Sequence, residues 1–172
     1  MPILTDLNKF WYGRLVYAGL WLILLIFCGK KGRIIALLLI PLLTLSDQVS
    51  SSIIKNLIQR SRPCWDENGI PIVPGLRLLV DCGGGYSFPS SHAVNNFGVA
   101  TFLSYYYRKS LFAFISIAGL IAFTRLYVGV HYPSDAIGGA GIGVTIAFGF
   151  IAFWNLVEKK YPQVAIRPKE TE

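Results

Sequence analysis

Charged side chains are scarce in this sequence of 172 residues, and acidic ones are the scarcest, with nine Asp plus Glu. Charged residues make up 15% of the chain and hydrophobic residues 53%, whereas soluble domains carry about 25% charge. This composition excludes a disordered chain, a collagen and a coiled coil. It indicates a protein that hides most of its surface in an apolar solvent.

Cysteine is also rare, since three residues are too few for a disulfide-rich scaffold. Cys28 stands alone at the end of an apolar stretch, where we interpret it as a space filler. Cys64 and Cys82 flank the only long polar loop, which runs from Ser61 to Phe88. If that loop faces an oxidising compartment, the pair is a plausible disulfide worth about 3 kcal/mol of loop closure.

The chain length matches about five spanning helices of about 20 residues with short connections, in one domain over residues 1–172. Apolar stretches occur at about Phe10 to Cys28, Ile34 to Ile58, Phe88 to Tyr107, Leu111 to Val130 and Ala136 to Val157. We therefore predict an all-α, polytopic membrane helical bundle with one outer-face loop at about 61–88.

The second stretch becomes polar in its outer half, from Ser46 onward, and its polar residues recur at helical spacing. They are Asp47, Gln48, Ser51, Ser52, Lys55 and Gln59. A polar face at membrane depth normally looks into a bundle interior or a water-filled cavity.

The fifth stretch contains a G-x-x-x-G pattern from Gly139 to Gly143. Small residues at this spacing let helix backbones approach closely. We expect these glycines to pack within the bundle and not to form a dimer.

Basic residues indicate the orientation of the bundle. One set of helix ends carries Lys30, Lys31, Arg33, Arg108, Lys109, Lys159 and Lys160. The positive-inside rule makes those ends cytoplasmic, which leaves the N-terminus, the polar loop and the turn at His131 outside. The net charge of +7 then reflects cytoplasmic loops, and we predict neither a nucleic-acid partner nor an obligate protein partner.

The outer ends carry a second group of reactive or charged residues, namely Lys55, Arg62, Ser90, Ser91, His92, Arg125, His131 and Asp135. Several cations around one point suit a tetrahedral dianion such as phosphate. The helix start at Ser90 to His92 adds backbone N–H groups and hydroxyls. A helix continuing to Pro63 would carry Lys55 and Arg62, seven residues apart, on one face.

The two histidines of the chain could have complementary chemical roles, one as a nucleophile and one as an acid. Asp135, four residues after His131, can accept one ring N–H and leave the other nitrogen for attack on phosphorus. His92 can give a proton to a departing alkoxide.

Most of these residues also have a simpler interpretation, which for His131 is an interfacial histidine with its hydrogen bonds satisfied. Ser90 or Asp135 can be a helix cap, Arg62 or Arg125 can anchor at lipid headgroups, and Lys55 can pair with Asp47. Their joint occurrence favours a site.

Three segments carry a resemblance to a known family: KNLIQRSRP (55–63), PSSH (89–92) and TRLYVGVHYPSD (124–135). They resemble the signature of the type-2 phosphatidic acid phosphatase superfamily, K-x6-R-P, P-S-G-H and S-R-x5-H-x3-D. Ser91 stands where the family usually has Gly, and Thr124 where it usually has Ser.

The resemblance implies hydrolysis of a phosphate ester without metal or cofactor, through a phosphohistidine. His131 would be the nucleophile, Asp135 its orienting partner and His92 the acid. The phosphoryl group would be bound by Lys55, Arg62, Ser90, Ser91 and Arg125. Family members more often have six spans, and a bundle of five would be open-sided, so that a lipid could present its headgroup laterally.

We therefore expect a lipid phosphate phosphatase of a bacterial inner membrane with a periplasmic active site. Lipid A 1-phosphate is the leading candidate substrate and phosphatidylglycerophosphate the next. Alternatives are an undecaprenyl diphosphate phosphatase, a small anion or lipid transporter whose polar residues would line the full membrane depth, and an inactive lipid-binding protein.

Overall fold

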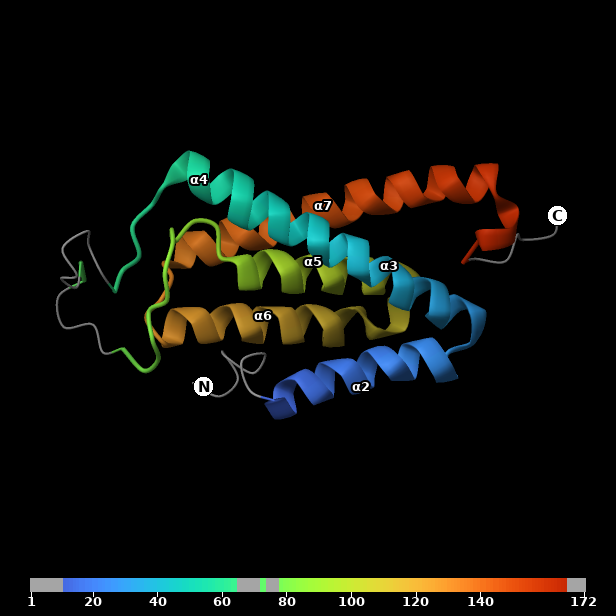
Figure 1. The fold of residues 1–172 in the computed structure, drawn as a ribbon, viewed down its shortest axis with the longest axis horizontal. Coiled ribbons are helices and arrows are strands. Elements are labelled where there is room, and N and C mark those ends of the chain that lie inside the picture. Colours follow the sequence, from blue (N-terminus) through green and yellow to red (C-terminus); the bar gives the residue numbers. More distant parts are fainter. Residues whose placement is uncertain (1–10, 65–71, 74–77, 167–172) are drawn as a thin grey trace.

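The computed structural model describes residues 11–64, 72–73 and 78–166, and its regular structure there is entirely helical. Five rods run back and forth as an antiparallel bundle (Figure 1). The rods are α2 (Trp11–Phe27); α3 (Gly29–Asp47), η2 (Gln48–Ile54) and α4 (Lys55–Ile58) joined end to end; α5 (Ser91–Tyr106); α6 (Leu111–Tyr127); and α7 (Pro133–Lys160). Short 3-10 turns, η3 (Arg108–Ser110) and η4 (Pro162–Val164), flank them. The predicted all-α bundle of five helices is confirmed.

Three of the rods, 29–58, 108–127 and 133–160, are long and apolar enough to cross a membrane. α2 is also apolar but has 17 residues. α5 has 16 residues, a length of about 24 Å, which is less than the roughly 30 Å of a hydrocarbon core.

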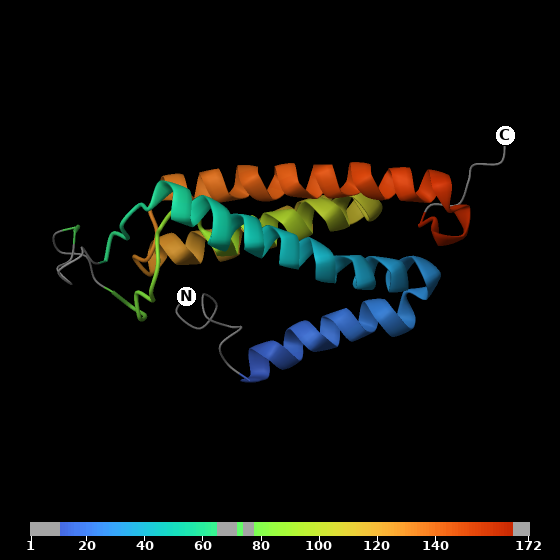
Figure 2. The ribbon, with the colours of Figure 1, turned by 45° about the horizontal axis from the view of Figure 1, so that its top comes forward.

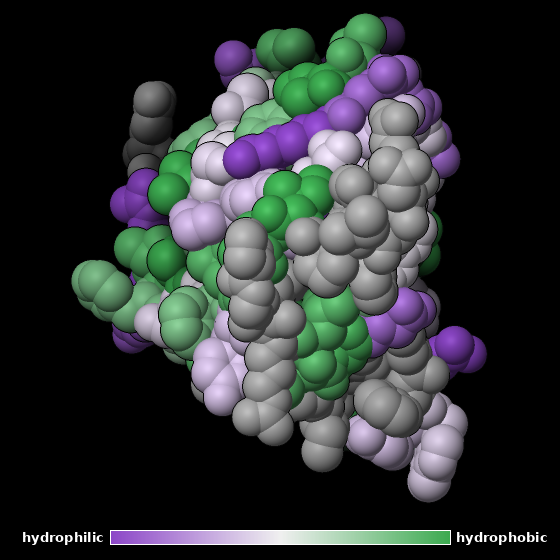
Figure 3. Space-filling view, turned by 90° about the vertical axis from the view of Figure 1, so that its left-hand side faces the viewer, coloured by the Kyte–Doolittle hydropathy of each residue, from purple (hydrophilic) through white to green (hydrophobic). Residues whose placement is uncertain are grey.

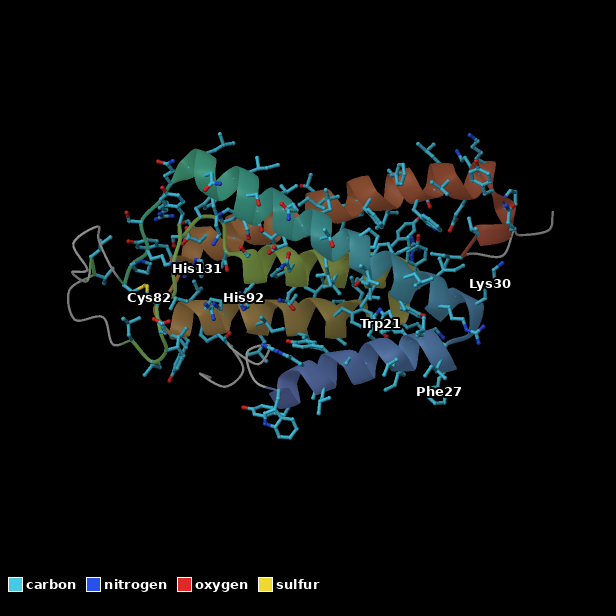
Figure 4. All side chains as sticks on the ribbon, in the orientation of Figure 1. Trp21, Phe27, Lys30, Cys82, His92 and His131 are labelled. Atoms are coloured by element: carbon cyan, nitrogen blue, oxygen red, sulfur yellow. A yellow bond between two sulfur atoms is a disulfide. The ribbon has the colours of Figure 1, made fainter. Side chains whose placement is uncertain are left out.

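The second rod begins at Gly29, so the predicted start near Ile34 is wrong by about one turn. The basic residues Lys30, Lys31 and Arg33 therefore lie in the first turns of this helix. This position is possible because long cationic side chains can reach polar groups at a helix end. Lys31 Nζ donates to the carbonyl of Tyr106 at 2.6 Å and lies 4.5 Å from the ring centroid of Tyr107. Lys30 lies at the end of the bundle opposite to His131 (Figure 4).

The pairing of α5 with α7 depends on the two glycines of the G-x-x-x-G pattern. A Cβ at Gly139 would meet the carbonyl oxygen of Ser90 at 2.8 Å, and one at Gly143 would collide with the carbonyl of Val94. The predicted packing of these glycines within the bundle is confirmed. Farther along the same pair, Phe102 of α5 and Ala147 of α7 belong to the core cluster that α3 completes.

α2 packs against α3 and diverges from the rest of the bundle towards its start (Figure 2). Near the other end of α2, the indole N–H of Trp21 donates to the carbonyl of Ala36 at 2.8 Å. A groove of about 870 Å³ lies between α2, α3, α5 and α6.

Candidate active site

His131 and Asp135 lie at the start of α7 and are both buried. Asp135 Oδ2 accepts the backbone N–H of Tyr132 at 2.8 Å, which caps the helix, and lies 3.5 Å from His131 Nδ1. The carboxylate of Asp135 therefore both caps the helix and contacts the imidazole of His131. Because Nδ1 faces the carboxylate, the other ring nitrogen, Nε2, is the one left for chemistry.

Two further side chains, which the sequence analysis did not identify, complete the surroundings of Asp135. Ser87 Oγ donates to Asp135 Oδ2 and lies 3.4 Å from His131 Nδ1. Arg60 Nη1 donates to Asp135 Oδ1 at 2.8 Å and to Ser134 Oγ at 2.7 Å. Asp135 thus has a donor on each oxygen.

Arg60 reaches Asp135 because the helix ends early. α4 ends at Ile58, and Gln59 adopts a left-handed conformation with φ 48°. The prediction that one continuing helix carries Lys55 and Arg62 is therefore wrong. The left-handed residue reverses the chain, and the Arg60 carbonyl then accepts the N–H of Ser87 at 2.7 Å.

Lys55 and Arg62 still meet at the same loop. Lys55 Nζ donates to the carbonyl of Tyr86 at 3.0 Å. The guanidinium of Arg62 donates to the carbonyls of Gly85 at 3.0 Å and Cys82 at 3.1 Å. The loop carbonyls hold both cations at the end of the bundle where hydrophilic side chains appear among apolar ones (Figure 3).

The electrostatics of the site keep His131 neutral. Burial, together with the positive charges of Arg62, Lys55 and Arg125, lowers the pKa of His131 to about 4, against the opposing effect of its bond to Asp135. Burial likewise lowers the pKa of Arg62, helped by the charge of Arg125. A neutral imidazole surrounded by cations can act as a nucleophile towards an anion.

The start of α5 faces this cluster. The N–H of Ser90 donates to the carbonyl of Asp135 at 3.1 Å, and the hydroxyl of Ser90 is buried with no hydrogen-bond partner among the described residues. The first turn of α5 includes His92, and the N–H groups of a helix's first turn favour an anion. His92 and His131 lie at the same end of the molecule (Figure 4).

The two departures from the family signature have different surroundings. The hydroxyl of Ser91 lies 3.2 Å from Ser51 Oγ and 3.4 Å from Ser50 Oγ, both on η2. Thr124 Oγ1 donates to the carbonyl of Ile121 at 2.6 Å. Ser91 is therefore engaged with η2, and Thr124 with its own helix.

Cys64 and Cys82 are joined by a disulfide, with their Cα atoms 6.2 Å apart. The bridge is buried against Val128 and Val130, which lead from α6 to His131. It therefore ties the ends of the outer loop to the turn that carries the histidine. Within the described part of the chain, no three His, Cys, Asp or Glu side chains gather as metal ligands.

Comparison with known proteins identifies a family and several relatives. The family model of the PAP2 superfamily matches residues 34–159. A lipid A 4′-phosphatase of Bacteroides thetaiotaomicron is 42% identical over 123 residues, which are 68% of this chain and 51% of that protein. A phosphatidylglycerophosphatase B of Bacillus subtilis is 31% identical over 115 residues, 60% of this chain and 50% of that protein.

The fold has a counterpart among solved structures. The crystal structure of a transmembrane PAP2-type phosphatidylglycerolphosphate phosphatase from Bacillus subtilis aligns with a TM-score of 0.64 at 22% identity, over 83% of this chain and 70% of that one.

A helical bundle with three rods long and apolar enough to cross a membrane defines a multi-pass membrane protein. The chain belongs to the PAP2 superfamily. It spans about half the length of the relatives named above.

Proposed function

We propose that the protein is a lipid phosphate phosphatase that works through a phosphohistidine. The observation that carries this proposal is the buried, neutral His131, held by Asp135 and surrounded by the charges of Lys55, Arg62 and Arg125. These are the groups needed to bring a nucleophile and a phosphate dianion together.

The reaction follows from these positions. His131 Nε2 attacks phosphorus, the bond between phosphorus and the lipid oxygen breaks, and His92 gives that oxygen a proton. Lys55, Arg62, Arg125, Ser90 and the first N–H groups of α5 stabilise the charge on the phosphoryl oxygens. Water, deprotonated by His92, then breaks the phosphorus–nitrogen bond, releases inorganic phosphate and regenerates both histidines.

A lipid substrate is supported by the groove between α2 and α6, which His92 lines together with apolar side chains. The groove leaves room for the hydrocarbon part of a substrate beside the reacting phosphate. We propose a lipid A phosphate as the first candidate. The relatives are named for the 4′-phosphate, which differs from the 1-phosphate expected from the sequence, so the 4′-phosphate becomes the leading substrate.

Other substrates remain candidates. Phosphatidylglycerophosphate is supported by the name of the Bacillus subtilis relative, and an undecaprenyl diphosphate by that of another. The basic ends opposite the site favour a periplasmic active site in a bacterial inner membrane.

Phosphate release by detergent-purified protein in excess EDTA tests the proposal, with lipid A, phosphatidylglycerophosphate, phosphatidic acid and undecaprenyl diphosphate as substrates. We expect release that survives chelation and disappears in His131→Ala. An absence of release from all four by folded protein would overturn the proposal and favour the transporter alternative.

A further inference from the structure

Ser87 contacts both His131 and Asp135, the histidine and the carboxylate at the centre of the site. Its side chain is fully buried, as is that of Asp135. Ser87 Oγ donates to Asp135 Oδ2 and lies 3.4 Å from His131 Nδ1. The distance from His131 Nδ1 to Asp135 Oδ2 is 3.5 Å. The ring nitrogen thus faces a hydroxyl oxygen and a carboxylate oxygen at almost the same distance.

The direction of the hydroxyl hydrogen follows from these contacts. Ser87 has one hydrogen on Oγ, and an ionised carboxylate only accepts, so we assign this hydrogen to the bond with Asp135. Ser87 therefore turns a lone pair towards His131 Nδ1. A hydrogen on Nδ1 has an acceptor in each neighbour, whereas a lone pair there would face two other lone pairs. Both neighbours consequently favour the neutral imidazole with its hydrogen on Nδ1 and its lone pair on Nε2.

The backbone fixes the hydroxyl in this place. The N–H of Ser87 donates to the carbonyl of Arg60 at 2.7 Å. The carbonyls of the two residues before Ser87 accept hydrogen bonds from Lys55 and Arg62, each at 3.0 Å. The position of the hydroxyl is therefore set by the same segment that holds both cations.

Both lone pairs of Asp135 Oδ2 are already taken. This oxygen accepts the N–H of Tyr132 at 2.8 Å as well as the hydroxyl of Ser87. A second acceptor beside Nδ1 therefore adds to what the carboxylate provides. When Nε2 attacks phosphorus, the ring becomes an imidazolium, and hydrogen bonds from a charged donor are about twice as strong as neutral ones. Ser87 Oγ then stabilises the positive charge together with the carboxylate.

We infer that Ser87 is a positioning residue that holds His131 with its hydrogen on Nδ1 and stabilises the positive charge that the ring gains when Nε2 attacks phosphorus. The attack rests on the proposed function, whereas the place of the hydrogen is a property of the protein without substrate. One test therefore uses hydrolysis, and a second does not.

The first test is steady-state hydrolysis by Ser87→Ala of the lipid phosphate that the unaltered protein hydrolyses fastest. We expect kcat to fall about fivefold, the equivalent of one net hydrogen bond. KM should not change, since Ser87 is not among the groups that we assign to phosphate. Ser61→Ala, which removes an exposed side chain from the same loop, is the matched control and should leave both constants unchanged. An unchanged kcat in folded Ser87→Ala would overturn the inference.

The second test is nitrogen NMR of histidine-labelled protein at neutral pH, with His92→Gln to assign the signals. The spectra distinguish a ring nitrogen that carries a hydrogen from one that does not. We expect His131 of the unaltered protein to carry its hydrogen on Nδ1. In Ser87→Ala, the ratio of the Nε2–H form to the Nδ1–H form should rise about fivefold.

A hydrogen on Nε2 in the unaltered protein, or an unchanged ratio of the two forms in Ser87→Ala, overturns the inference. The expected change in this ratio, without hydrolysis of any of the four lipids, supports the role of Ser87 in placing the hydrogen and argues against the proposed function.

Discussion

Arg60 and Asp135, which are 75 residues apart in the sequence, are joined at the centre of the site by a charged hydrogen bond of 2.8 Å from Nη1 to Oδ1. Arg60 also lies 4.1 Å from the ring centroid of Tyr132 and donates to Ser134. Arg60, which follows the end of α4, thus contacts three residues that come shortly after His131 in the sequence: Tyr132, Ser134 and Asp135. We regard Arg60 as a positioning residue, since it acts on His131 through Asp135.

Replacing Arg60 with Gln should lower kcat by about 10- to 100-fold, because a buried carboxylate loses a charged donor worth about 1.5–3 kcal/mol. KM should change little, since Arg60 is not among the cations that we assign to phosphate. Arg33→Gln, at the opposite end of the bundle, is the control. Steady-state kinetics on both variants would contradict the assignment if kcat fell equally in the two, or if Arg60→Gln raised KM alone.

The pKa of His131 gives a prediction that needs no substrate. The ordinary value is about 6.5, and burial with three nearby cations lowers the pKa of His131 to about 4. The imidazole should therefore stay neutral as the pH falls past 6.5 and take up its proton only near pH 4. Histidine-labelled protein shows this directly by NMR titration, with His92→Gln to assign the two signals.

Arg62→Gln should raise the pKa of His131, because it removes the positive charge that lowers the pKa most among the three cations. The titration midpoint should move upward, towards 6.5. An unchanged midpoint, or one that moves downward, would show that Arg62 does not act on His131 electrostatically.

Two neighbouring glycines of α7 allow a matched test of helix packing. Gly139→Ala should destabilise the protein by about 1–3 kcal/mol, because the new Cβ would lie 2.8 Å from the Ser90 carbonyl and 3.0 Å from the Ala93 side chain. Gly141→Ala should be neutral or slightly stabilising, since a Cβ there meets nothing within 4 Å. Thermal unfolding in one detergent measures both, and equal midpoints would contradict this packing.

The disulfide should matter for activity as well as for stability. Replacing Cys64 and Cys82 together with Ser should cost about 3 kcal/mol of loop-closure stabilisation. It should also raise KM, because Arg62 is held partly by the carbonyl of Cys82. The same changes should follow reduction of the unaltered protein by dithiothreitol, whereas Cys28→Ser should change neither quantity. Full activity of the double variant would show that the disulfide-bonded loop does not contribute to phosphate binding.

The sequence was sufficient to predict the five helices because apolar runs of this length form helices in a bilayer. It also predicted that Gly139 and Gly143 pack internally. The start of α3 was predicted about one turn late, since a charge cluster marks where side chains reach water and not where the helical backbone begins.

Arg60 and Ser87 were missed for a different reason. Arg60 lies in the sequence between Lys55 and Arg62, the two cations of the signature. The direction of its side chain depends on the left-handed conformation of Gln59. The sequence does not reveal that conformation, because glycine or asparagine usually adopts it. Ser87 is one of many loop serines, and only the folded loop brings it to Asp135. Contacts made by an irregular chain cannot be deduced from periodicity.

The π-helical turns of η2, at residues 48–54, have a consequence for how this membrane rod could be altered. A π-turn bonds residue i to i+5 in place of i+4, so η2 fits one more residue into its turns than an α-helix would. Deleting one of the serines from Ser50 to Ser52 would return the segment to α-helical bonding and leave Lys55 directed at the carbonyl of Tyr86. The rod therefore carries an additional serine near the site without a change in the direction of the lysine that follows.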